Sequence, residues 1–115
     1  QCFAHDMPEN HALAFVYTTL PDEAAASAMA RALIEARLAA CCNILPPMRS
    51  VYRWGGAIEN QRETAMLIKT CRDMVDRVID AARPLHPYAT PCFLTLGIEA
   101  ANAPYLAWAL AETAD

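Results

Sequence analysis

The stretch Ala12–Glu23, with the sequence ALAFVYTTLPDE, changes character at Pro21 and sets the first two elements of the fold. Residues 12–19 are apolar, aromatic or β-branched, which predicts a buried strand. Pro21 suits the first turn of a helix, and the two acids that follow it complement the helix dipole. Apolar residues then recur at helical spacing, so we expect this helix to end near Ala40. The chain therefore begins with a strand followed by a helix.

The middle of the chain predicts an extended segment that two prolines interrupt, and a return strand that a glycine turn joins to it. Residues 41–45 form a short apolar run that two prolines stop. Strand-favouring residues occupy 49–54, and a return strand is predicted from about residue 62 to 70. Between them lies Gly55-Gly56, the only glycine pair of the sequence and its clearest hairpin signal.

The last third predicts a helix, a strand and a second helix. Asp73 opens the first helix, residues 90–98 alternate as a strand, and Asn102 caps a helix that ends near Thr113. The order β-α-β-β-α-β plus a C-terminal helix is the split βαβ, ferredoxin-like plan, an α+β fold with two helices on one face of an antiparallel sheet. Because the other face is left bare, we expect copies of the chain to bury it.

Length, composition and charge exclude several classes of protein. The 115 residues fit one domain, which we place at residues 12–115, with residues 1–11 as an N-terminal leader or a remnant of expression. Hydrophobic residues make up 56% of the chain, yet no apolar run approaches the roughly 20 residues of a transmembrane helix. The net charge is −4 and the arginines are scattered among acids. We therefore expect neither nucleic acid nor an anionic membrane as a partner.

The cysteines and one histidine are the candidate metal ligands. Five cysteines cannot all pair within one chain, so we expect reduced thiols and a cytoplasmic location. Thiolate and imidazole suit copper and zinc, which makes His86, Cys92 and Cys41 the candidate set. No C-x-x-C or H-x₃-H spacing is present, so such a site must join distant segments or several subunits. The alternative is that the cysteines are small buried hydrophobes and that His86 interacts with carbonyls at a helix end.

A polar set near the predicted hairpin is a second candidate site. Glu63 and Lys69 are six residues apart, so they share one face of the predicted return strand. Together with Glu59 they could form solvated or intersubunit ion pairs, which mostly carry no chemistry. The alternative is a cleft between subunits that binds a small anion or a metal and is lined by these residues together with Tyr52, Trp54, His86 and Tyr88.

Several segments, in this order, resemble the CutA family of divalent-cation tolerance proteins: Tyr17–Glu23, Leu38–Asn43, Ser50–Trp54, Ile58-Glu59, Lys69-Thr70, His86–Pro91 and Tyr105–Trp108. The likeness covers about residues 12–112, and the most specific part is His86-Pro87-Tyr88-Ala89-Thr90-Pro91. The resemblance implies a homotrimer of PII-like architecture, with sheets packed face inward around a threefold axis. It also implies a role in tolerance to copper and other divalent ions, which some members bind. No catalysed reaction is established for the family.

Two departures bear on any site that this resemblance implies. The family usually has an acid and a lysine in the hairpin, as Trp-Glu-Gly-Lys, whereas this chain has Trp54-Gly55-Gly56-Ala57. Cys92 stands where the family usually has glutamate. A site that depends on those charges is therefore lost, or is rebuilt with a thiol.

These observations give one expected function and one alternative. We expect a non-enzymatic, cytoplasmic homotrimer with a role in tolerance to divalent ions such as copper, which binds a metal or a small ligand between subunits. The alternative is a structural trimer that recruits protein partners without binding metal. Nucleophile-elbow, P-loop and H-E-x-x-H motifs are absent from the sequence. The segment 18–22 also lacks the C-x-x-C of copper chaperones and the arginine of acylphosphatases.

Overall fold

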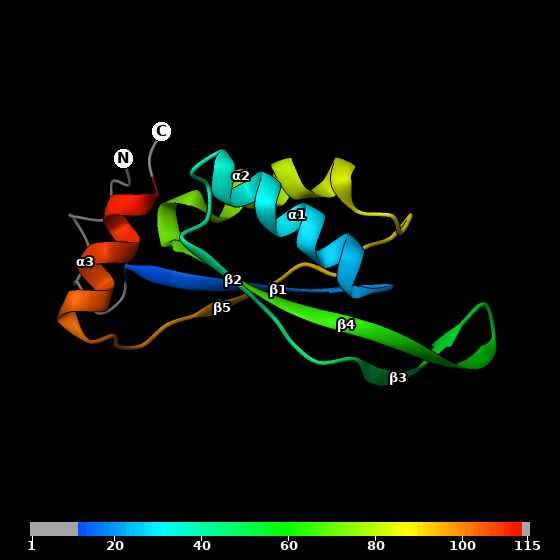
Figure 1. Ribbon diagram of the computed structural model, residues 1–115. Coiled ribbons are helices and arrows are strands. Elements are labelled where there is room, and N and C mark those ends of the chain that lie inside the picture. The colour runs from blue at the N-terminus through cyan, green and yellow to red at the C-terminus, as the bar shows by residue number, and fades with distance from the viewer. Residues whose placement is uncertain (1–11, 114–115) are drawn as a thin grey trace.

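Residues 12–113 are described by the structure, a computed structural model, and they form an antiparallel sheet with helices on one side (Figure 1). The predicted leader, residues 1–11, lies outside the described residues. The elements are β1 (Leu13–Leu20), α1 (Glu23–Glu35), β2 (Cys41–Ile44), β3 (Met48–Trp54), β4 (Ala57–Cys71), α2 (Val75–Ala82), β5 (Leu94–Gly97) and α3 (Ala103–Glu112). Short 3₁₀ turns, η3 (Arg72–Met74) and η4 (Arg83–Leu85), flank α2. The predicted α+β, ferredoxin-like fold is confirmed, but the structure has one strand more than the predicted order, because the extended segment before the glycine turn is divided into β2 and β3.

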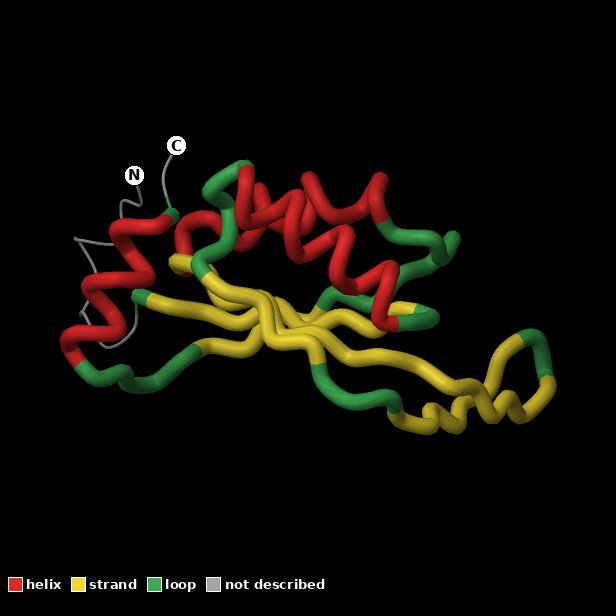
Figure 2. The backbone as a smooth tube through the Cα atoms, in the orientation of Figure 1, coloured by secondary structure: helices red, strands yellow, loops and turns green. Residues whose placement is uncertain are grey.

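The strand β4 belongs to two parts of the molecule. Its first half, 57–63, pairs with β3 as a hairpin, and its second half, 64–71, lies between β1 and β2 in a sheet of order β2-β4-β1-β5. Figure 2 shows the hairpin projecting beyond the helices, and the molecule measures 46 Å along its longest axis against 26 and 22 Å across. The 15-residue strand therefore connects a projecting arm to the body.

The helix α1 ends at Glu35 and not near Ala40, as the alanine-rich pattern predicted. Arg37 has a φ of 61°, in the left-handed region, which stops the helix. The amide of Arg37 donates to the carbonyl of Ile34 at 3.0 Å, and the amide of Leu38 donates to that of Leu33 at 3.0 Å. Likewise, β4 begins at Ala57 and not near residue 62, because its pairing with β3 runs up to the turn.

The two faces of the sheet differ in what covers them. Figure 1 shows α1 and α2 on one side, where Val16 and Ile68 are fully buried. On the other side lie Phe15, Tyr17, Leu67, Leu94 and Leu96, which we call the open face; the register of β1 places them side by side. No helix among residues 12–113 covers this face along its length, and Leu94 and Leu96 are 57% and 47% exposed. The bare face predicted from the sequence is therefore present.

Two further observations concern the expected class of protein. Within residues 12–113, no helix is long and apolar enough to cross a membrane. Cys41, Cys42 and Cys92 are free thiols, as expected, whereas Cys71 is disulfide-bonded. The expectation of reduced thiols is therefore wrong at Cys71.

Candidate functional site

A cavity of about 530 Å³ lies where the hairpin leaves the body of the protein. Its walls come from β1, β3, β4 and the segment that leads into β5. The lining residues are Thr19, Tyr52, Trp54, Glu63, Pro87, Tyr88, Ala89, Thr90 and Cys92. The sequence segment that most resembled a known family, His86–Pro91, therefore supplies one wall of this cavity.

The strand geometry explains why these side chains meet. Glu63 is the last residue of β4 that pairs with β3, and Thr64 is the first that pairs with β1. Tyr52 and Trp54 are two residues apart on β3, so their side chains leave the same face of the hairpin. Thr19 faces the opposite way from Val16 and from the helices, toward the side of the sheet that bears Glu63.

The carboxylate of Glu63 is the charged group of the cavity wall. Glu63 is 8% exposed, and its Oε2 accepts a hydrogen bond of 2.8 Å from the hydroxyl of Tyr88. The pKa of Tyr88 is raised far above its ordinary value. Burial is the largest cause, and this hydrogen bond to a carboxylate is the second. Tyr88 therefore remains a neutral phenol and a hydrogen-bond donor at any physiological pH.

The ring of His86 lies behind the cavity wall, with both nitrogens engaged. Nδ1 accepts a hydrogen bond of 3.2 Å from the amide of Tyr88, so the proton resides on Nε2. Nε2 donates to the carbonyl of Thr19 at 2.9 Å, and the hydroxyl of Thr18 lies 3.3 Å from the same nitrogen. Burial lowers the pKa of His86, while the Thr19 carbonyl and Glu63 act in the opposite direction. His86 thus fastens the 86–92 segment to the end of β1.

The thiol of Cys92 is held in its protonated form. Burial raises its pKa, and the negative charge of Glu63 adds to the effect. Burial, Cys92 and Glu63 together raise the pKa of Tyr17, on the same side of the sheet. A neutral thiol is a poor nucleophile and has to release its proton before it can bind a metal ion, so the cavity of one chain does not activate Cys92.

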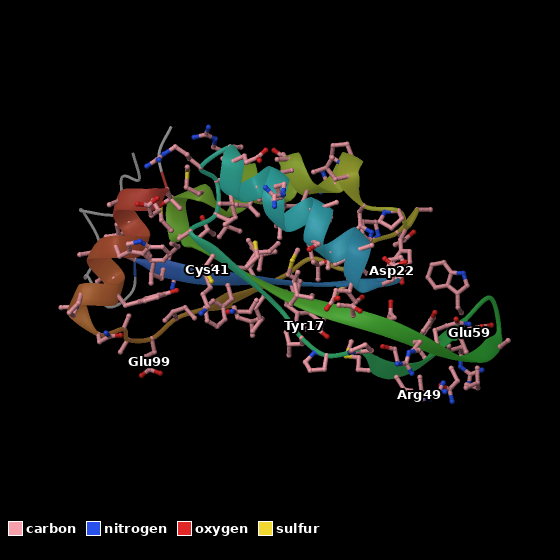
Figure 3. The ribbon with its side chains drawn as sticks, viewed as in Figure 1. Tyr17, Asp22, Cys41, Arg49, Glu59 and Glu99 are labelled. Atoms are coloured by element: carbon pink, nitrogen blue, oxygen red, sulfur yellow. The ribbon has the colours of Figure 1, made fainter. Side chains whose placement is uncertain are left out.

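The predicted metal ligands are not gathered in one chain. Cys41 pairs with Lys69, whereas Thr19 of the cavity pairs with Ala65, four residues and about 13 Å away along β4. Figure 3 shows Cys41 well away from the hairpin, on which Glu59 is labelled. Among residues 12–113 there is no group of three His, Cys, Asp or Glu side chains that could hold a metal ion. A metal site built from His86, Cys92 and Cys41 would need a second subunit.

The predicted ligand-binding residues divide into two groups. Tyr52, Trp54, Glu63 and Tyr88 line the cavity. Glu59 and Lys69 do not line the cavity. The carboxylate of Glu59 accepts a hydrogen bond of 3.3 Å from the side-chain Nε2 of Gln61 on the hairpin. The ammonium of Lys69 lies 5.8 Å from the ring centre of Phe15 and 5.5 Å from that of Tyr105, at the other end of the strand.

Sequence reasoning missed four residues that shape the site. Thr19 and Thr90 line the cavity, Thr18 contacts His86, and Tyr17 lies close enough to Cys92 and Glu63 for their charges to affect it. The sequence predicts only that the stretch around Tyr17 is a buried strand, and the prediction does not divide its side chains between the two faces. The alternation of strand side chains would have placed Tyr17 and Thr19 on the face opposite Val16.

The comparisons with known proteins agree on one family. Residues 14–112 match the sequence model of the CutA1 divalent ion tolerance protein. The chain is 42% identical over 102 residues to protein CutA of Homo sapiens, a match that covers 89% of this chain but 56% of the human protein. It is 40% identical over 93 residues to the divalent-cation tolerance protein CutA of Thermus thermophilus, covering 81% of this chain and 90% of that protein. The structure of a periplasmic divalent cation tolerance protein CutA from Archaeoglobus fulgidus superposes with a TM-score of 0.86 and 35% identity, covering 89% and 99% of the two chains.

Proposed function

Because the chain belongs to the CutA1 divalent ion tolerance family, we propose that it is a non-enzymatic homotrimer that contributes to tolerance of divalent metal ions such as copper by binding a ligand between its subunits. The observation that carries the ligand-binding part is the carboxylate of Glu63, which is nine-tenths buried in the wall of an open cavity. A buried charge is costly unless it is paired, so its position in a cavity wall supports a binding role.

The surface of the chain supports the assembly. The open face exposes two leucines, and Trp54 at the end of the hairpin is 62% exposed. Contiguous exposed apolar surface favours association, and a second copy is the partner that the family resemblance implies. The cavity is lined by this hairpin, so assembly through the arm would close the cleft between subunits. The chain spans about half the length of the human relative, so the role of the whole protein belongs to the proposal.

One observation favours the alternative, a structural trimer that recruits protein partners without metal. Both ring nitrogens of His86 are engaged within the chain, at 2.9 and 3.2 Å. A metal ion would have to displace one of these bonds. Under this alternative His86 acts only by holding the 86–92 segment in place.

The location of the protein is part of the proposal. The free thiols of Cys41, Cys42 and Cys92 support the cytoplasm. The disulfide at Cys71 favours an oxidising compartment, as does the description of the Archaeoglobus relative as periplasmic.

A metal titration separates the two functions. We expect the reduced protein to bind Zn(II) or Cu(II) in a calorimetric titration, and we expect Cys92→Ser and Cys41→Ser each to weaken this binding by at least about tenfold, because each removes a proposed ligand. His86→Ala is measured in parallel, with circular dichroism to confirm its fold.

Cys42→Ser is the matched control, since it also removes one free thiol. Burial raises the pKa of Cys42 to about 12, and strand alternation points it away from the face that bears Cys41. Affinity that is unchanged in all three proposed-ligand variants contradicts the metal set. Absence of binding by the parent protein supports the structural alternative.

A further inference from the structure

The charges around the cavity are all of one sign. Glu63 is the charged residue among those that line it, and the carboxylate of Asp22 lies close enough to contribute to the raised pKa of Tyr88. Within the described part of the chain, neither lysine nor arginine lines the cavity. Lys69 is held by Phe15 and Tyr105, and the guanidinium of Arg49 donates to Asn60 on the hairpin. Among residues 12–113 of one chain, the charged groups at this cavity therefore favour a cation over the small anion considered from the sequence.

The carboxylate of Glu63 is only half used by the protein. Oε2 accepts the hydroxyl of Tyr88, whereas Oε1 accepts no hydrogen bond and meets no cation from residues 12–113. No side-chain oxygen in this part of the chain is both fully enclosed and unbonded, so Oε1 is reachable from the cavity that Glu63 lines. A nine-tenths buried carboxylate with one open oxygen is the counterpart of a positively charged hydrogen-bond donor.

Aromatic side chains supply the rest of the lining. Tyr52, Trp54 and Tyr88 lie around the carboxylate, on two segments of the chain. Rings of this kind attract an organic cation to their faces, with tryptophan the strongest, and they pack against its hydrocarbon part. The protonated thiol of Cys92 and the hydroxyls of Thr19 and Thr90 add neutral polar contacts.

We propose that this cavity binds a small organic cation, an alkyl- or arylammonium, with its charge at Glu63 and its hydrocarbon part against Tyr52 and Trp54. The inference rests on the ligand-binding role proposed above and names the class of ligand. A bare metal ion fits the cavity of a single chain less well, because metal sites require three or more ligands and residues 12–113 offer one carboxylate and one neutral thiol here. An ammonium group requires one carboxylate and aromatic faces, and both are present.

Three probes that share a benzyl ring test the charge preference: benzylammonium, benzyl alcohol and benzoate. We expect benzylammonium to bind the intact protein at neutral pH at least about tenfold more tightly than benzoate, by calorimetry or ligand-observed NMR. Glu63→Gln keeps the size of the side chain and removes its charge, and it should abolish this preference. Glu99→Gln removes an exposed carboxylate at the other end of the molecule from the hairpin (Figure 3), and it should leave the preference unchanged.

Trp54→Leu keeps the test decisive if Glu63→Gln fails to fold. Trp54 is exposed on the hairpin, so its replacement spares the core, and we expect it to weaken benzylammonium several-fold. Equal binding of the three probes, all weakened by Trp54→Leu, would overturn the cation preference and leave the ligand cavity standing. Tighter binding of benzoate would do the same. If the intact protein binds none of the probes, both the cation site and the proposed ligand cavity are overturned.

Discussion

His86 shows how one side chain can connect distant parts of the chain. Its ring donates a hydrogen bond to the carbonyl of Thr19 and accepts one from the amide of Tyr88. The hydroxyl of Tyr88 in turn donates a hydrogen bond to the carboxylate of Glu63. A single neutral imidazole therefore joins β1, the segment before β5 and β4. The protonated ring would lose the acceptor at Nδ1, because both nitrogens then carry protons.

We expect this arrangement to make the protein less stable in mild acid. The pKa of His86 is lower in the folded protein than its ordinary value of 6.5, so below that pH the unfolded chain binds more protons than the folded one. The free energy of unfolding then falls as the pH falls from 6.5 toward the folded pKa, by up to about 1.4 kcal/mol per unit of pKa separation. Urea unfolding at pH 7.5 and 5.5 measures this loss.

His86→Gln provides the comparison, because a glutamine amide can still donate to Thr19 but does not titrate. Glu63 is the charged group that faces His86, and it is present in both proteins, so its contribution is common to the two. We expect a smaller loss of stability in the variant. Equal losses in the two proteins would show that His86 does not set the acid sensitivity.

The hairpin turn requires two residues with positive φ. Gly55 has a φ of 59° and Gly56 of 83°, between Trp54 and Ala57, which pair with each other. A two-residue turn with positive φ at both positions is the type I′ hairpin turn, whose twist matches that of the strands. The glycine pair therefore fixes the register of β3 against β4.

Gly56→Ala should lower the free energy of unfolding by about 1 kcal/mol, since an L side chain is strained at this φ. Nothing lies within 4 Å of the Cβ that alanine would add, so strain and not crowding is responsible. Gly55→Asn is the matched control and should be nearly neutral, because asparagine tolerates the left-handed region. Equal losses for both variants in urea unfolding would contradict this explanation.

At the scale of the whole molecule, the open face and the projecting hairpin are surfaces that one chain leaves uncovered. Phe15 and Tyr17 of β1 lie next to Leu96 and Leu94 of β5, so the apolar side chains form a continuous patch. The burial of such a patch between copies would stabilise an assembly at roughly 25 cal/mol per Å² of apolar area.

Leu96→Glu should therefore dissociate the proposed trimer. We expect light scattering to give three chain masses for the parent protein at micromolar concentration and one chain mass for the variant, because the substitution places a charge in the buried patch. Ile34→Glu is the control, since Ile34 is also exposed but lies on α1, on the opposite side of the sheet. A monomeric parent protein, or a Leu96→Glu trimer, would contradict the assembly through this face.

The sequence predicted the elements better than their ends and better than the site. Alternation and the glycine pair identified the strands, because both are local properties of the chain. The end of α1 was missed because the alanines beyond Glu35 continue a helical pattern, while the left-handed Arg37 that stops the helix has no such signal. Glu63 and Lys69 do share one face of β4, as the sequence predicts. They lie far apart because the strand between them is extended, so a shared face does not by itself place two residues in one site.

The continuous β4 limits how the length of this protein can vary between relatives. Side chains alternate along the strand, so inserting or deleting one residue between Glu63 and Ala65 would turn every following side chain to the other face. Ile68 would then leave the core for the open face. Insertions or deletions are tolerable in the arm, beyond Glu63, where β3 and β4 can change together by equal numbers of residues. A paired change in the length of the arm therefore leaves the faces of the body strands as they are, whereas a change at the junction at Glu63 reverses them.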